Sequence, residues 1–197
     1  MQISVRTNIK DVQKTLTRIE RKQIPYASSV AINNTAKKVV SAEQKQMPIK
    51  LDRPRPQTIK AIRISKYAKK DSLYARVGFL DWAQPFMQLE VFGGTRNVKT
   101  VVPLNEYGGK LNKYGSIAGR RTNGWANRHK QFFVKSKGKT LLMRPQGRDD
   151  QVVVGVMKHN PVYKRKFPFF QIAGGVVKRM FPREFNKALA HALRTAR

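Results

Sequence analysis

The spacing of apolar residues changes twice along the chain and divides it into three segments. From Val5 to Met47, apolar and small residues recur every three to four positions, which is the period of an α-helix. From residue 58 to residue 157, short runs alternate apolar and polar positions, as half-buried strands do. From Phe169 the helical period returns. The pattern predicts an α+β fold with N-terminal helices, a central antiparallel β-sheet and a C-terminal kinked helix.

The N-terminal helical segment, residues 1–47, predicts two helices. Asn8 is a suitable cap for the first, which carries Val12, Leu16 and Ile19 on one face. Ile24-Pro25 interrupts the pattern, and Pro suits the first turn of a second helix. Met47-Pro48 is expected to end that helix. Its expected buried positions are Ala27, Val30, Ala31, Asn34, Val39 and Val40.

A Pro-rich connector, residues 48–56, leads into a β-rich core over residues 57–157. Lys69-Lys70-Asp71 and Lys137-Gly138-Lys139 have the composition of hairpin turns. No stretch long enough for a crossover helix separates the strands, so we expect them to pair antiparallel. The predicted strands are Thr58–Tyr67, Ser72–Phe79, Met87–Phe92, Lys99–Val102, Gln131–Lys135, Thr140–Arg144 and Gln151–Met157.

The C-terminal helical segment, residues 167–197, repeats apolar residues at helical spacing on both sides of Pro182. Pro in a helix interior removes a hydrogen bond and clashes with the preceding turn, so Pro182 is expected to kink the helix or divide it in two. Gly174-Gly175 weakens the helix before that point. The whole chain, residues 1–197, is interpreted as a single α+β domain.

The net charge of the chain indicates what kind of partner it has. There are 41 Lys and Arg against 11 Asp and Glu, a formal net charge of +30. Such a surplus points to an anionic partner, and nucleic acid, acidic proteins and anionic membrane surfaces are the candidates. With 40% hydrophobic residues the chain can still fill a core.

Several classes of protein are excluded or disfavoured by composition. The absence of Cys excludes disulfides, thiolate zinc sites and Cys nucleophiles. No apolar run approaches the roughly 20 residues of a membrane helix, and the N-terminus lacks the apolar region of a secretory signal. We therefore expect a soluble protein that is made in the cytoplasm and has no membrane partner.

One stretch, residues 108–148, concentrates the positive charge without any acid. Its loop, residues 108–130, contains five Gly, and Tyr114, Trp125, Phe132 and Phe133 are interleaved with the cations. Flexible basic backbone can approach phosphates closely, and aromatic rings can stack on unpaired bases. The predicted nucleic-acid-binding residues are Lys110, Lys113, Arg120, Arg121, Arg128, Lys130, Lys135, Lys137, Lys139, Arg144 and Arg148.

Two simpler interpretations of this stretch remain open: the aromatic residues anchor the loop to the core, and the charges form a solvated face. A surface that faces phosphates or an acidic partner is the preferred interpretation. No zinc-finger spacing, RNA-recognition motif or helix-turn-helix is present in the sequence. Any contact with nucleic acid is therefore expected to involve the phosphate backbone and to be indifferent to base sequence.

Catalytic chemistry has little support in the sequence. His129, His159 and His191 lack metal-ligand spacing, and Asp149-Asp150 precedes a predicted strand, where turn chemistry explains it. A nuclease would require converging carboxylates, for which Glu90, Glu106 and the Asp pair are the candidates without supporting spacing. The glycine-rich pieces do not match a phosphate-binding loop. We expect no enzyme activity, no cofactor and no metal.

Two segments resemble a known family. IPYASSVAINNTAKKVVSA (24–42) resembles the N-terminal helix of the lambda-type phage minor tail protein Z family, in which Pro and small residues precede Ala-Ile-Asn and basic residues. FPFFQIAGGVVKRMFPREFNKALAHAL (167–193) is similar to the C-terminal arrangement of that family. The resemblance covers about 46 of the 197 residues.

The resemblance implies a structural virion protein that completes the tail at the head–tail junction, located in the tail or neck. It also implies a homo-oligomeric ring around the DNA channel, in contact with neighbouring tail and connector proteins and with double-stranded DNA through its phosphates. Trp82, Phe86, Met87 and Trp125 are candidates for ring interfaces, with core packing as the alternative. The alternative function is a general nucleic-acid-binding protein of ribosomal or nucleoid type, and a nuclease is a third hypothesis.

Overall fold

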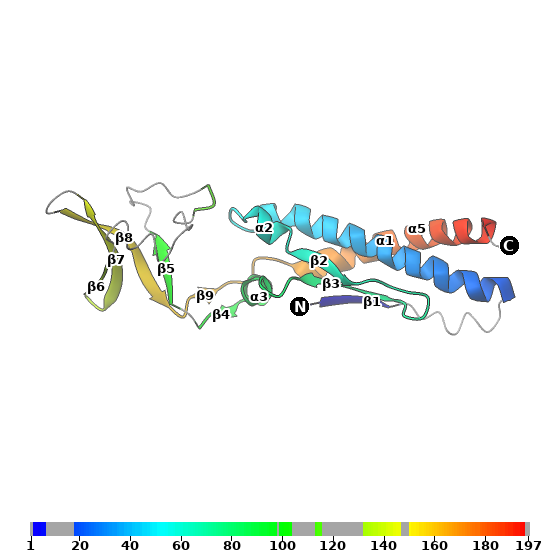
Figure 1. Cartoon of the computed structure of the whole chain (residues 1–197), viewed down its shortest axis with the longest axis horizontal. Coiled ribbons are helices and arrows are strands. Elements are labelled where there is room, and N and C mark those ends of the chain that lie inside the picture. The colour runs from blue at the N-terminus through cyan, green and yellow to red at the C-terminus, as the bar shows by residue number, and fades with distance from the viewer. Residues whose placement is uncertain are drawn as a thin grey trace. The chain divides into compact units, whose positions relative to one another are not determined.

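The computed structural model describes residues 2–6, 18–97, 99–103, 113–115, 132–146 and 150–195. It confirms the α+β class, because long helices at both ends of the chain accompany antiparallel sheets (Figure 1). Where the sequence was interpreted as one domain, the chain divides into two compact units. Residues 1–91 and 165–197 form the first unit, and residues 92–164 form the second.

The first unit is a pair of antiparallel helices packed on a three-stranded sheet. Helix α1 lies alongside α5, and α1 also contacts β2 and β3 (Figure 1). The sheet has the strand order β1-β3-β2, with both pairs antiparallel. The elements are β1 (Gln2–Arg6), α1 (Arg18–Lys50), α2 (Pro56–Ile59), β2 (Ile62–Lys66), β3 (Tyr74–Phe79), α3 (Gln84–Phe92) and α5 (Phe169–Arg194).

Helix α1 runs without a break through Pro25 and ends at Lys50, so the predicted interruption at Ile24-Pro25 and the end at Met47 are wrong. Pro25 removes one helical hydrogen bond at a cost of roughly 3 kcal/mol. Buried residues on both sides of it, Ile24 and Ala27, continue one face of the helix. Tertiary packing therefore overrides the local cost. The predicted first helix begins in residues 7–17, which lie outside the described residues, and β1 was not predicted.

The predicted burial along α1 is partly confirmed. Ala27, Ala31 and Val39 are fully buried, whereas Val30, Asn34 and Val40 are half-buried. Small side chains at the seam allow the helix axes to approach closely.

The predicted alternation over residues 58–79 is confirmed as β2 and β3, with Thr58 and Ile59 in the short helix α2 instead. Ile62 pairs with Phe79, and Ile64 with Val77, on the side of the sheet that faces the core. The predicted turn Lys69-Lys70-Asp71 connects the strands through a bridge between Lys69 and Ser72.

The predicted strand Met87–Phe92 is wrong, because these residues belong to helix α3. Met87 and Val91 are both buried and lie four positions apart, which is helical spacing. The short apolar run fits either period, and burial of one helical face decides between them.

Side-chain hydrogen bonds join α1 both to the sheet and to α5. The Asn33 amide donates to the Ala68 carbonyl at 3.0 Å and accepts from the Ala68 N–H at 2.8 Å, which ties α1 to the end of β2. Glu184 of α5 accepts from Lys38 at 2.7 Å and from Asn34 at 3.2 Å. The Lys38 hydrogen bond holds the pKa of Glu184 below its ordinary value.

Helix α5 is a single helix through Pro182, so the alternative of two separate helices is excluded. Its entry is fixed by the Glu90 carbonyl, which accepts from the Lys166 and Phe167 N–H groups at 2.8 and 2.9 Å. Phe169 then packs against Phe79, with ring centroids 5.3 Å apart. These contacts anchor the start of α5 in the core.

The second unit contains a four-stranded antiparallel sheet with the order β5-β8-β7-β6 and a two-stranded pair, β4-β9. The strand predictions in this region are confirmed to within a few residues. Antiparallel pairing is confirmed as well, although the strands of the described residues form three sheets and not one. The strands are β4 (Gly94–Thr95), β5 (Lys99–Pro103), β6 (Phe132–Ser136), β7 (Lys139–Gln146), β8 (Asp150–His159) and β9 (Val162–Tyr163).

Gly155→Ala tests the close approach of β5 to β8. A Cβ at this position would lie 2.7 Å from Val101 Cγ1 and 2.9 Å from the Val102 carbonyl oxygen, so the strand backbone must move. We expect a loss of roughly 1–3 kcal/mol in the free energy of unfolding of the second unit, measured by chemical denaturation. Unchanged stability would contradict the strand spacing described above.

Gly174→Ala and Gly175→Ala are expected to have the opposite effect. Nothing lies within 4 Å of a Cβ at either position, and both residues are helical. Each substitution should stabilise the fold by up to about 1 kcal/mol, because Ala has the higher helix propensity. Gly138→Ala is the control: it also meets no atom within 4 Å, but its φ of +74° strains any other residue, so it should destabilise the fold.

Candidate nucleic-acid interface

The predicted basic stretch is partly described by the structure. Lys113 lies in a turn, Lys135 in β6, and Lys137 between β6 and β7; Lys139 and Arg144 are in β7. The remaining predicted residues lie outside the described residues: Lys110, Arg120, Arg121, Arg128, Lys130 and Arg148. The structure therefore brings Lys135, Lys137, Lys139 and Arg144 together on one hairpin, which we call the basic hairpin (residues 132–146), whereas Lys113 lies outside it.

Backbone geometry determines how the basic hairpin presents its charge. Lys137 and Gly138 both have positive φ, 45° and 74°, which is typical of a two-residue type I′ turn. Lys135 pairs with Thr140, and Ser136 pairs with Lys139. Directly paired residues share a face of the ribbon and successive residues alternate, so Lys135 and Lys139 lie on opposite faces. Three exposed lysines thus surround the end of the hairpin.

The aromatic residues of the stretch have different environments. Phe133 is 55% exposed, so the interpretation that it anchors the stretch to the core is wrong. Phe132 is half-buried. The ring of Tyr114 lies 5.3 Å from the Lys113 ammonium. Trp125 and most of the loop lie outside the described residues.

Sequence reasoning missed a second group of basic residues. Arg63, Lys66 and Arg76 lie on neighbouring strands of the first unit, where Arg63 and Lys66 are exposed and Arg76 is half-exposed. The alternation of residues 58–79 contained the signal, since the charged positions alternate with the apolar ones that we assigned to the core.

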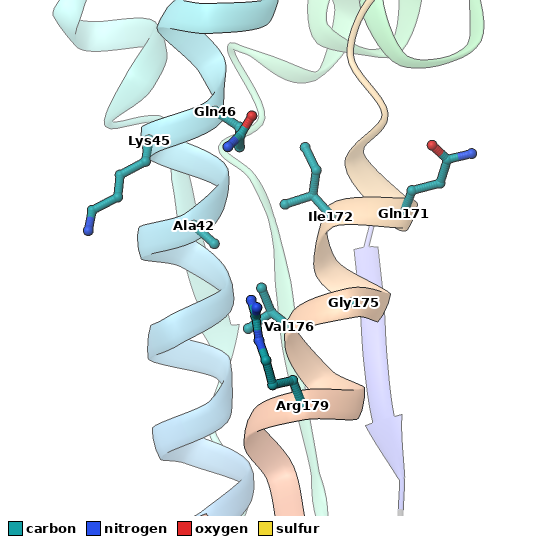
Figure 2. A pocket seen from close by; sticks show the side chains of 8 residues that line it. All are labelled: Ala42, Lys45, Gln46, Gln171, Ile172, Gly175, Val176 and Arg179. Atoms are coloured by element: carbon teal, nitrogen blue, oxygen red, sulfur yellow. The ribbon is translucent and has the colours of Figure 1, made fainter.

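A groove lies between α1 and α5 (Figure 2). Its volume is about 450 Å³. Val176 and Arg179 lie in the gap between the helices, whereas Lys45 points away from it. The lining residues are Ala42, Lys45, Gln46, Gln171, Ile172, Gly175, Val176 and Arg179. The groove thus combines an apolar floor with two cations and no acid.

The candidate interface residues Trp82, Phe86 and Met87 differ in their exposure to solvent. Trp82 is 52% exposed, and its ring lies 5.9 Å from that of Phe86. Met87 is only 1% exposed, so its prediction as an interface residue is wrong: it points into the core from α3. Trp125 lies outside the described residues.

The candidate catalytic residues do not converge in the described part of the chain. No group of three His, Asp or Glu with the spacing of a metal site occurs among the described residues. His159 and His191 are exposed, on different units. Glu90 is half-buried, and burial raises the pKa of its carboxyl. His129, Glu106 and Asp149 lie outside the described residues.

Glu43 is the most perturbed acid in the described structure. It is fully buried on α1, and neither carboxylate oxygen has a hydrogen-bond partner among the described residues. Burial raises its pKa from 4.5 to about 8, and the nearby Ala173 N–H offsets part of that rise. At neutral pH the side chain is therefore held as the neutral acid. It lies near Ala173 of α5.

Comparison with known proteins gives no relative for this chain: no family model, curated protein or solved structure matches it. None of the helices in the described ranges has the length and apolarity needed to span a membrane.

The raised pKa of Glu43 predicts stability that depends on pH. Between pH 4.5 and about 8 the unfolded chain releases this proton while the folded chain keeps it. The contribution of Glu43 to the free energy of unfolding is therefore greatest below pH 4.5. It falls by about 1.4 kcal/mol per pH unit as the pH rises from 4.5 to about 8. Glu43→Gln, which stays neutral, should remove this slope in denaturation curves measured from pH 5 to about 8.

Glu184→Gln is the matched control. The pKa of Glu184 is lowered in the fold, so its contribution is present above the ordinary value and is lost as pH falls. This variant should leave the slope at neutral and alkaline pH unchanged. An unaltered slope in Glu43→Gln would show that Glu43 ionises freely.

Proposed function

We propose that this chain is a structural virion protein of a tailed phage that completes the tail at the neck. In this proposal it forms a ring around the DNA channel and contacts the DNA through phosphates, independently of base sequence. Catalysis, a cofactor and a metal have no part in the proposal.

The observation that carries the proposal is the position of the two segments that resemble the minor tail protein Z family. Residues 24–42 lie within α1, and residues 167–193 contain nearly all of α5. These two helices pack against each other along their length. The resemblance therefore falls on one continuous piece of tertiary structure, although more than 120 residues separate its two segments in the chain.

The surface of this helix pair offers a means of assembly. The groove over Gly175 and Val176 is concave, and the Trp82 ring on another part of the same unit is apolar and 52% exposed. A cyclic ring uses two different surfaces on each protomer, one complementary to the other. The groove and the surface around Trp82 are the two candidates on this unit.

The charge supports a polyanion inside or beside the assembly. A protomer of +30 repels its copies, and a ring brings many such protomers together. DNA phosphates supply the missing negative charge, and the exposed lysines of the basic hairpin are suited to phosphate contacts. The same lysines also favour the alternative, a general nucleic-acid-binding protein.

Purified phage particles test the proposal. Antibody labelling of this chain should place it at the head–tail junction, and native mass spectrometry of the purified protein should give one closed oligomer of defined copy number. A general nucleic-acid-binding protein should instead be absent from particles and bind DNA as a monomer or dimer. A chain found only in a free cytoplasmic pool would contradict the tail assignment.

A further inference from the structure

Strands β2 and β3 of the first unit carry their charged residues on one side of the sheet. Ile62, Ile64, Ala75, Val77 and Phe79 point toward the helices and belong to the core or pack against it. The alternate positions form what we call the open face, which carries Arg63, Ser65 and Lys66 from β2 and Tyr74, Arg76 and Gly78 from β3.

A β-bulge at Ser65 places Lys66 on the open face. Ile64 pairs with Val77, whereas Lys66 pairs with Arg76, so Ser65 is the extra residue of β2. In a regular strand Lys66 would share the face of Ile62 and Ile64. The bulge turns it to the opposite face, and the Ser65 hydroxyl secures the irregularity by donating to the Arg76 carbonyl at 3.3 Å.

The bulge brings two cations into direct opposition. Lys66 and Arg76 are register partners, and like charges opposite each other on adjacent strands destabilise a sheet. Arg63, which pairs with Gly78, lies diagonally from Arg76. None of β1, β2 and β3 contains an Asp or Glu, and the neighbouring acids Asp71 and Asp81 stand beyond the ends of β3.

Tyr74 positions one of these cations. Lys66 donates a hydrogen bond to the Tyr74 hydroxyl, and its ammonium lies 4.3 Å from the centroid of the same ring. This hydrogen bond lowers the pKa of Tyr74. A lysine with two contacts to one ring loses conformational freedom in the free protein, so less is lost when it meets an anion.

From this arrangement we infer that the open face binds the phosphate backbone of double-stranded DNA through Arg63, Lys66 and Arg76. The site is separate from residues 108–148, and the inference rests on the proposed function for the identity of the polyanion. A phosphate backbone relieves the repulsion between Lys66 and Arg76, and Arg side chains suit the geometry of phosphate oxygens.

An acidic protein is a less suitable partner for this face. Stable protein interfaces depend on buried aromatic or aliphatic anchors at their centre. The positions of the open face in β2 and β3 offer none apart from Tyr74, which is half-buried and engaged by Lys66. Cations on a sheet without apolar anchors suit a ligand that is recognised by the charge and spacing of its phosphates and not by its base sequence.

Salt-dependent DNA binding by the full chain tests the inference. Wild type and the triple variant Arg63→Gln/Lys66→Gln/Arg76→Gln are titrated with a short fluorescent DNA duplex over a range of salt concentrations. Each lost phosphate contact should reduce the slope of log affinity against log salt by about one, so the triple variant should lose about three. Two duplexes of unrelated sequence should be affected equally.

The matched control is Lys37→Gln/Arg183→Gln/Arg194→Gln, which removes the same residue types and the same charge from exposed positions on α1 and α5. It should change the slope by less than about one. An equal loss in both variants would overturn the inference, because net charge alone would then explain binding. Thermal unfolding of each variant shows whether the fold is retained. If the triple variant does not fold, the single variant Arg63→Gln, which leaves the bulge residues unchanged, takes its place.

The basic hairpin provides the second comparison. If Lys135→Gln/Lys137→Gln/Lys139→Gln abolishes the salt dependence and the open-face variant does not, the inference fails while the proposed function stands. The opposite result is also possible: the chain is absent from phage particles, but the open-face variant reduces the slope of log affinity against log salt by about three. The proposed function then fails while the inference stands. Wild-type protein that does not bind the duplex at physiological salt would overturn the inference, and an acidic protein would then be the better candidate partner.

Discussion

The antiparallel seam between α1 and α5 is the constraint on which the first unit depends. The two helices come from opposite ends of the chain, and each contains internal Pro, which does not favour a helix. Buried residues at the seam and beneath it, such as Ala31, Ala173 and Val176, compensate for those local costs. The sheet packs on this pair through contacts of α1 with β2 and β3 and of α5 with β1.

Acids are few in this chain, and the structure uses two of them in contrasting ways. Glu184 is ionised and bridges α5 to Lys38 and Asn34 of α1. Glu43 is buried without a partner among the described residues and is held neutral at physiological pH. Neither acid neutralises the cations of the strands or of the basic hairpin. Exposed cations therefore occur on both units among the described residues.

The candidate sites differ in how far the sequence could predict them. The hairpin turn was predictable from Lys137-Gly138-Lys139, because few residues other than Gly accept a positive φ. The open face was not predicted, although its alternation is visible in residues 58–79. Its key feature is the bulge at Ser65, which depends on pairing with β3, and no local pattern indicates where a pairing register shifts. Met87 was misplaced for a related reason, since a short apolar run fits a strand or a helix equally well.

The sequence by itself determined the class of the fold, the antiparallel pairing, most strand positions and the large excess of positive charge. These follow from short-range periodicity, turn chemistry and composition, all of which act within a few residues. Tertiary structure alone decided that α1 and α5 continue through Pro25 and Pro182 and that residues 92–164 form a second compact unit. It also decided which cations share a face. Each of these outcomes depends on contacts between residues far apart in the chain, whose free energy exceeds the local preferences that sequence patterns report.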